Sequence, residues 1–368
     1  MILILGSNGL LGSYVKNFLS KKKIKFITLG RKNCDINGDI LNTNFLNKII
    51  KKINPKIIIN FAAYADVDKC EKNKILAMQL NSELPTNISN IISSKVFFIH
   101  ISTDHIYNGK GPHKENGTIK LLNNYAKTKF LGEKNIRHKN SCILRINFFG
   151  KSISKNRSSF SDWAFKAIKN KKKMNLFKDV FFSPISMENF SKSLYLILKK
   201  KITGTYNLGS NKGFSKEKFI LHFAKRLKYK KIKYNSISYD DLKISIKRPK
   251  DMRMDCKKIE KKLGIKLNNL IDEINYTAKS YWMNGSFHIN KNKIGKDGPV
   301  YFIADIAANH DGSLTRAKKL IKLCAKAGAN AAKFQHFKAN TIVSDFGFRK
   351  LKKISHQKKW KKSVFEVY

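Results

Sequence analysis

The sequence opens with MILILGSNGLLGSYV, residues 1–15, and this stretch decides the fold. Residues 1–5 form an unbroken apolar run, which is the pattern of a parallel strand buried on both faces. Gly6, Gly9 and Gly12 follow at G-x-x-G-x-x-G spacing, and apolar side chains then recur at helical intervals. A strand, a glycine turn and a helix predict a dinucleotide site, because backbone N–H groups at the helix start can meet a pyrophosphate. Three ordinary turn glycines are the alternative interpretation.

Two later strand ends extend this predicted site. The apolar run 25–29 leads to Arg31, and an arginine here suits the extra phosphate of NADP, whereas an acid would favour NAD. A surface arginine in a turn is the alternative. The run 56–61 ends in small residues, which let a dinucleotide lie across the strand end. Asp39 stands at a third strand–helix junction, where it either touches the adenine or caps a helix.

A candidate acid–base group follows the apolar run 96–101, which leads to Thr103. Tyr125 and Lys129 are four residues apart, so a helix places them on one face. An ammonium group beside a phenol stabilises the phenolate and lowers the pKa of the tyrosine. Thr103 can supply a hydroxyl to the same oxygen. Such a group suits proton transfer to a carbonyl oxygen while hydride reaches the carbonyl carbon.

The predicted site residues fall into three groups. The catalytic residues are Thr103, Tyr125 and Lys129. The residues expected to bind the cofactor, NADPH or alternatively NADH, are Gly6, Asn8, Gly9, Leu10, Gly12, Arg31, Asp39, Ile40, Ala62, Ala63, Tyr64, Tyr125 and Lys129. The substrate-binding residues are Ser102, Asp104, Arg248 and Arg253. The two arginines are candidates for a diphosphate, because a guanidinium matches two phosphate oxygens at once; plain surface arginines are the alternative.

Composition narrows the class of protein. The 368 residues carry a formal charge of +50, but only nine of the 75 basic residues are arginine, and the lysines are spread along the whole chain. We therefore expect a solvated lysine surface and no nucleic-acid partner. Five scattered cysteines indicate reduced thiols in a cytoplasm. No apolar run is long enough for a membrane span, and the start lacks the pattern of a signal peptide.

No metal site is predicted either. The acids Asp66, Asp68 and Glu71 lie close together, but no histidine accompanies them. They stand at the expected start of a helix, where a carboxylate interacts favourably with the helix dipole. A capping role is therefore favoured over a metal cluster.

Residues 1 to about 285 resemble the extended short-chain dehydrogenase/reductase family and, within it, the dTDP-4-dehydrorhamnose reductases. The matching stretches are GSNGLLGS, INFAAYADVDKCE, HISTDHIYNG, NNYAKTKFLGE, LRINFFG, SPISMENFSKSL, GTYNLGS and RPKDMRMDCKKIEKKLG. The resemblance implies an NADPH-type cofactor on the first half and a nucleotide-sugar pocket made largely by the second. It places Thr103, Tyr125 and Lys129 at the catalytic positions of the family.

Residues 299–368 have a different character. FIADIAANHDGS and GANAAKFQHFKANTIVS resemble the start of the sialic acid (N-acetylneuraminate) synthase family, a (β/α)₈ barrel. The resemblance implies that Asp305, Lys333 and Gln335 face phosphoenolpyruvate and an acylated amino sugar. Two of eight strands are expected, so this part is expected to be inert by itself. We expect a truncated reductase–synthase fusion, with a structural appendage as the alternative.

The sequence thus predicts an α/β protein. A Rossmann-type doubly wound parallel sheet (about 1–155) is followed by a smaller substrate-binding part (about 156–285), a linker (286–298) and an incomplete (β/α)₈ fragment (299–368). We expect NADPH-dependent reduction of a 4-keto deoxy nucleotide sugar in surface polysaccharide or nonulosonic acid precursor synthesis. The alternatives are a nucleotide-sugar epimerase or dehydratase, and a non-catalytic regulatory subunit. No membrane partner is expected, and a homodimer is allowed.

Overall fold

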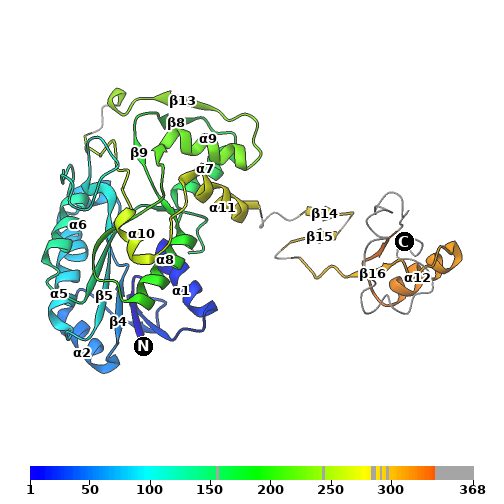
Figure 1. Cartoon of the computed structure of the whole chain (residues 1–368), viewed down its shortest axis with the longest axis horizontal. Coiled ribbons are helices and arrows are strands. Elements are labelled where there is room, and N and C mark those ends of the chain that lie inside the picture. The colour runs from blue at the N-terminus through cyan, green and yellow to red at the C-terminus, as the bar shows by residue number, and fades with distance from the viewer. Residues whose placement is uncertain (155–156, 243–244, 283–286, 291, 296–297, 336–368) are drawn as a thin grey trace, which may run out of the picture. The chain divides into compact units, whose positions relative to one another are not determined.

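The structure, a computed structural model, describes residues 1–154, 157–242, 245–282, 287–290, 292–295 and 298–335. The chain divides into two compact units, Met1–Met283 and Asn284–Tyr368. The first unit contains a large sheet flanked by helices, and the second contains a hairpin and a small βαβ unit (Figure 1).

Seven parallel strands form the central sheet of the first unit, in the order β11-β6-β5-β4-β1-β2-β3. They are β1 (Ile2–Leu5), β2 (Phe26–Gly30), β3 (Ile36–Asn37), β4 (Ile57–Asn60), β5 (Phe97–Thr103), β6 (Ser141–Ile146) and β11 (Gly204–Leu208). The predicted strands at 1–5, 25–29, 56–61 and 96–101 are confirmed to within two residues. The strand order reverses beside β1, so a crevice opens at the carboxyl ends of β1 and β4.

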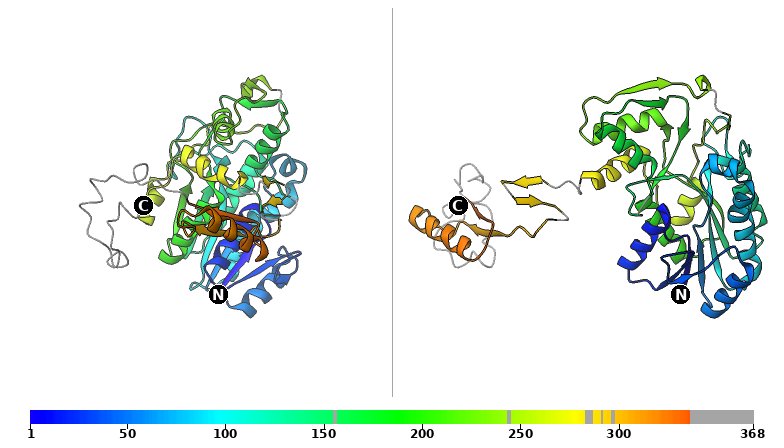
Figure 2. Two further views of the ribbon diagram at one scale, coloured as in Figure 1. Left: turned by 90° about the vertical axis from the view of Figure 1, so that its right-hand side faces the viewer. Right: turned by 180° about the vertical axis from the view of Figure 1, so that it is seen from behind.

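Helices cover both faces of this sheet (Figures 1 and 2). They are α1 (Leu10–Lys21), α2 (Thr43–Ile53), α3 (Val67–Lys72), α4 (Lys74–Met78), the π-helix η1 (Gln79–Glu83), α5 (Leu84–Ile91), α6 (Asn124–Asn135), α8 (Met187–Lys200) and α10 (Lys257–Leu263). A short 3-10 helix, η2 (Asp104–Ile106), follows β5 directly. The helix predicted over 75–94 is built from α4, η1 and α5 in succession.

Alternating side chains of β1 reach the two layers of helices. Ile2 and Ile4 belong to one core cluster, together with apolar residues of α1 and α8. Leu3 and Leu5 belong to another, together with apolar residues of α2, η1 and α5. Leu3, Ile4 and Leu5 are fully buried. The unbroken apolar run at the N-terminus is therefore explained by burial on both faces.

A smaller lobe with its own aromatic core completes the first unit. It contains α7 (Phe160–Lys169), α9 (Lys216–Arg226), α11 (Leu270–Trp282), η3 (Tyr239–Asp241) and the short strands β7 (Phe148–Phe149), β8 (Met174–Phe177), β9 (Phe181–Phe182), β10 (Ile185–Ser186), β12 (Phe214–Ser215) and β13 (Tyr234–Ile237). Phe149, Phe182 and Phe219 pack in its core, with the rings of Phe149 and Phe219 4.9 Å apart. The smaller lobe is not continuous in sequence. After its first elements, α8 packs on α1 and β11 pairs with β6 of the central sheet, and the chain then enters the lobe again.

The second unit contains the predicted βαβ segment. β16 (Ile303–Ala307) and β17 (Ala331–Phe334) pair in parallel and are joined by α12 (Leu314–Lys326). Part of the predicted linker forms an antiparallel hairpin instead, with β14 (Phe287–Ile289) and β15 (Asn292–Ile294). The resemblance over 336–368 lies outside the described residues, and the incomplete barrel stays a prediction.

Close packing of α6 on η1 predicts the effect of one substitution. A Cβ at Gly132 would overlap the backbone carbonyl oxygen of Asn81. We expect Gly132→Ala to lower the free energy of unfolding by about 1–3 kcal/mol, although alanine favours an isolated helix. Urea denaturation measures this, with Lys127→Ala on the exposed side of α6 as the control. An unchanged or higher stability of Gly132→Ala would contradict the packing.

Candidate functional site

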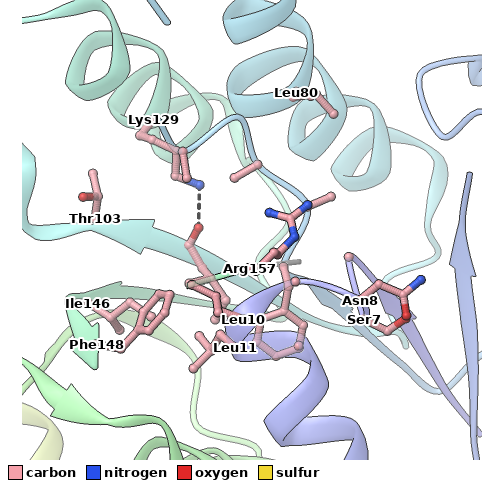
Figure 3. Close-up of a pocket in the computed structure, with 18 of the residues that line it drawn as sticks. Ser7, Asn8, Leu10, Leu11, Leu80, Thr103, Lys129, Ile146, Phe148 and Arg157 are labelled. Carbon is pink, nitrogen blue, oxygen red and sulfur yellow. Dashed lines mark hydrogen bonds between the residues drawn. The ribbon is translucent and has the colours of Figure 1, made fainter. Parts of the chain in front are cut away.

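A cavity of about 580 Å³ lies at the carboxyl ends of the central strands (Figure 3). Its walls come from the glycine turn, the ends of β2, β4, β5 and β6, and the first half of α6. The predicted residues that line it are Gly6, Asn8, Gly9, Leu10, Gly12, Arg31, Ile40, Ala62, Ala63, Ser102, Thr103, Asp104, Tyr125 and Lys129. One cavity therefore brings together the predicted cofactor residues and the predicted acid–base group.

The glycine turn needs its glycines because the backbone comes close to itself and to β4. Gly6 has a φ of +75°, and a Cβ there would lie 2.5 Å from the backbone nitrogen of Ala62. A Cβ at Gly12 would overlap the carbonyl oxygen of Gly6. The turn leads directly into α1, whose N-terminal residues have no acidic side chain among them. Free N–H groups and the positive end of the helix dipole therefore line the cavity, as an anionic group requires.

The neighbouring turn after β2 is tied to the glycine turn by Asn8. Its amide nitrogen donates to the carbonyl oxygens of Lys32 and Asn33 at 2.8 and 3.1 Å. Arg31 lines the cavity beside this contact. Because Asn8 joins the two turns, the backbone at Arg31 is held next to the glycine turn, at the edge of the cavity.

Asp39 and Tyr64, two predicted cofactor residues, do not line the cavity. The carboxylate of Asp39 accepts a hydrogen bond from the backbone nitrogen of Leu41 at 3.1 Å. The helix that follows is capped by Asn42, so the alternative interpretation of Asp39 as its cap is wrong. The backbone of Tyr64 exchanges two hydrogen bonds with the Asn81 side chain.

The three predicted catalytic residues meet at the end of β5. Thr103 ends this strand, and its hydroxyl accepts from the backbone nitrogen of His105 at 3.1 Å. Burial raises the pKa of Tyr125, hydrogen bonding to Thr103 opposes the rise, and the charge of Asp104 adds to it. Tyr125 is therefore held as a protonated phenol next to a hydroxyl, in the form that can give up a proton.

Lys129 is almost completely buried, at 2% exposure, and faces the same cavity. Its Nζ donates to the carbonyl oxygen of Ile101 at 2.6 Å (dashed line in Figure 3). Burial lowers the pKa of Lys129 to about 8. The expected lowering of the Tyr125 pKa by this ammonium is not seen, because desolvation is the largest effect on the pKa of both groups.

Ser102 and Asp104 flank Thr103, and both already have protein partners. The Ser102 hydroxyl donates to Glu133, which forms a buried ion pair with Arg145 at 2.7 Å. The carboxylate of Asp104 accepts from the Asn147 amide at 2.8 Å, and burial raises its pKa to about 7.

The two predicted arginines lie in different surroundings. Arg248 lines a second cavity of about 410 Å³, and its guanidinium pairs with Asp68 at 2.7 Å. Arg253 lines neither cavity, and its guanidinium binds Asp251 at 2.6 Å. Ala65, Val67 and His105 line both cavities, so the two cavities adjoin there.

Several site residues escaped the sequence reasoning. Asn147 and Arg157 line the main cavity, and Lys216 and Tyr239 line the second. Asn147 follows the end of β6, so the rule that ligands bind beyond the carboxyl ends of parallel strands could have found it. The others come from the smaller lobe, whose placement has no local sequence signal.

The predicted helix cap in the acidic cluster is confirmed. The carboxylate of Asp66 accepts from the backbone nitrogen of Lys69 at the start of α3. Among the described residues, no cluster of histidine, cysteine and acidic side chains could hold a metal ion. None of the described helices is long and apolar enough to cross a membrane.

The second unit brings two of its three predicted residues together. Lys333 Nζ lies 3.0 Å from the carboxylate of Asp305, and this hydrogen bond lowers the pKa of Asp305. The backbone nitrogen of Gln335 donates to Ala307, across the ends of the two strands.

A Rossmann sheet with a glycine turn at the carboxyl end of its first strand is typical of dinucleotide-binding proteins. The chain belongs to the family described as the RmlD substrate binding domain, whose model matches residues 1–282.

Three relatives illustrate the range of similarity. A protein of Haloferax volcanii, named as a probable low-salt glycan biosynthesis reductase, is 24% identical and covers 74% of this chain and 95% of its own. Methionine adenosyltransferase 2 subunit beta of Pongo abelii is 25% identical and covers 72% of this chain and 82% of its own. The crystal structure of dTDP-4-dehydrorhamnose reductase from Bacillus anthracis in complex with NADP has a TM-score of 0.69 and 21% identity. It covers 76% of this chain and 98% of its own.

Burial of Lys129 predicts a stability cost that depends on pH. The pKa falls from 10.5 to about 8 on folding, so the protonated lysine costs about 3 kcal/mol below pH 8. The cost diminishes as the pH rises from 8 towards 10.5 and is gone above it. We expect Lys129→Met to raise the free energy of unfolding by about 1–3 kcal/mol at pH 7, with a smaller gain at pH 10.

Urea denaturation at the two pH values measures this gain. Lys127→Met is the matched control, because Lys127 lies on the same helix and is exposed. A gain that does not shrink at pH 10, or a loss at pH 7, would show that Lys129 is not a strained buried ammonium.

Proposed function

We propose that residues 1 to about 285 reduce the 4-keto group of a deoxy nucleotide sugar with NADPH. The observation that carries the proposal is the single cavity lined by the glycine turn, Arg31, Thr103, Tyr125 and Lys129. The fit to a dinucleotide rests on the free N–H groups at the start of α1 and on the missing Cβ atoms of Gly6 and Gly12. Arg31 favours NADPH over NADH.

In this proposal the cofactor supplies the hydride, and the chain supplies the proton and the geometry. Tyr125 gives its phenolic proton to the carbonyl oxygen as the carbon is reduced. Thr103 hydrogen-bonds the same phenol and orients the carbonyl. Lys129 holds the ribose and, once protonated, stabilises the phenolate that remains.

The second cavity suits the nucleotide end of the substrate. Arg248 and Lys216 both line it and supply positive charge, and Phe177 and Tyr239 supply aromatic surface. His105 connects this cavity with the catalytic one, and its ring packs edge-on against that of Tyr125 with centroids 5.4 Å apart. A sugar diphosphate held here would present its sugar to Tyr125. Arg248, rather than Arg253, is therefore the stronger candidate for a phosphate contact.

Two other functions are the alternatives. An epimerase or dehydratase on the same scaffold would turn over without net loss of NADPH. A non-catalytic regulatory subunit is the other alternative, and one relative is named as a subunit, the beta subunit of methionine adenosyltransferase 2. Retention of all three predicted catalytic residues in one cavity favours an enzyme, because a pure binding protein does not need a proton donor.

For residues 299–368 we propose a portion of a sialic acid synthase-like barrel. The parallel βαβ unit and the pairing of Asp305 with Lys333 across its two strands support this proposal. We propose no reaction for this unit by itself, because a barrel site is assembled from the loops of several strands.

The proposed reductase function predicts the effect of removing the phenolic oxygen of Tyr125. Purified protein given NADPH and a panel of 4-keto nucleotide sugars should lose absorbance at the nicotinamide band with one of them. Tyr125→Phe should slow this loss by about 10²–10⁴-fold, since it removes the proton donor. Tyr234→Phe, at an exposed tyrosine in the smaller lobe, is the matched control and should leave the rate unchanged. A Tyr125→Phe protein of nearly full activity would overturn the assignment.

A further inference from the structure

Behind Lys129, two fully buried polar side chains form a short chain that leads away from the cavity. Asn60 ends β4, and His100 lies beside it on β5. The Nδ2 atom of Asn60 lies 3.3 Å from Nδ1 of His100, and Nε2 of His100 lies 3.4 Å from Nζ of Lys129. Asn60 and His100 are both 0% exposed, so we expect their polar atoms to find hydrogen-bond partners among neighbouring protein groups.

The backbone fixes the direction of the first hydrogen bond. The backbone N–H of Ala62 can only donate, and it donates to Oδ1 of Asn60 at 3.0 Å. The amide of Asn60 therefore presents its NH₂ group to His100, and Nδ1 of His100 must accept. Burial keeps the pKa of His100 well below its usual value, so the ring is neutral and carries its one proton on Nε2.

This proton points at Lys129. An ammonium group is purely a donor, so a charged Lys129 would face a second donor. The Nε2–Nζ distance of 3.4 Å is at the long end for a hydrogen bond, whereas the bond from Nζ to the carbonyl oxygen of Ile101 is short at 2.6 Å. A neutral amine fits better, because it can donate to Ile101 and accept from His100.

The other titratable groups around Lys129 favour its protonated form, whereas His100 disfavours it. Glu133, one turn along α6, and the thiol of Cys70 on α3 both raise the pKa of Lys129. Glu133 is itself neutralised by its ion pair with Arg145 on β6. Desolvation is the larger effect and lowers the pKa. The donor of His100 acts in the same direction as desolvation.

We propose that His100 is a positioning residue, locked by Asn60 as the Nε2–H tautomer, and that its N–H disfavours the protonated form of Lys129. Lys129 then loses its proton close to neutral pH, so the positive charge beside Tyr125 is present below that pH and absent above it. The catalytic consequence rests on the proposed reductase function, whereas the tautomer does not depend on it.

The tautomer is tested on the protein without cofactor. In ¹⁵N-histidine-labelled protein, long-range proton–nitrogen spectra separate Nδ1–H from Nε2–H rings. Loss of one ring in His100→Gln assigns His100 among the nine histidines. We expect Nε2–H in the natural protein. Asn60→Asp replaces the donor by an acceptor of the same shape, so it should move the proton to Nδ1.

Asn175→Asp is the matched control, since it makes the same change at an exposed position of β8, and it should leave His100 unchanged. An Nδ1–H ring in the natural protein would overturn the proposal, even if Asn60→Asp does not fold. An unchanged tautomer in folded Asn60→Asp would overturn it as well.

The kinetic consequence is measured separately. With NADPH and a substrate, the rate should fall with rising pH as Lys129 loses its proton. In Asn60→Asp this fall should move by about one pH unit or more to higher pH, because Nε2 then accepts from the ammonium. A fall at unchanged pH, with the tautomer switched, would refute the control of Lys129 by His100. Absence of NADPH oxidation in the natural protein would refute the reductase function and leave the tautomer result standing.

Discussion

Burial of β1 on both faces is the constraint on which the first unit depends. Ile2 and Ile4 contact one layer of helices and Leu3 and Leu5 the other, so this strand lies at the centre of the sheet. Its carboxyl end must then lie in the crevice between the two halves of the sheet. Because Gly6 comes close to Ala62 there, the glycine turn and the end of β4 form one continuous wall.

The position of the main cavity follows from the same geometry. β5 lies on the far side of β4 from β1, so its last residue, Thr103, opens into the cavity that the glycine turn begins. Packing of α6 against β5 and η1 then brings Tyr125 and Lys129 to that strand end. The close packing buries Lys129, and its depressed pKa is the energetic consequence. Function and local instability therefore have one cause, the removal of this amine from water.

Sequence reasoning predicted the part of the molecule that is controlled by local pattern. The strands, the glycine turn and the shared face of Tyr125 and Lys129 all follow from spacing within a few residues. It placed Asp39 as a cofactor contact or a cap, but Asn42 caps the helix, because the residue directly before α2 is the one that reaches its free N–H groups. Arg157 and Lys216 could not be predicted, since their positions depend on how the smaller lobe packs. The electrostatics of Lys129 were also missed, because they depend on burial and on His100, 29 residues away in sequence.

In the proposed reaction, a hydride from NADPH reaches a sugar carbonyl in this cavity while Tyr125 supplies the proton. Transfer of deuterium tests it most directly, with NADPH that carries deuterium at nicotinamide C4 on one face or the other. With one of the two cofactors, the sugar product should carry one deuterium at C4, with one NADP formed per product. An unlabelled product with the cofactor unchanged would contradict this reaction and indicate an epimerase or a dehydratase, and the absence of any product would indicate a binding protein.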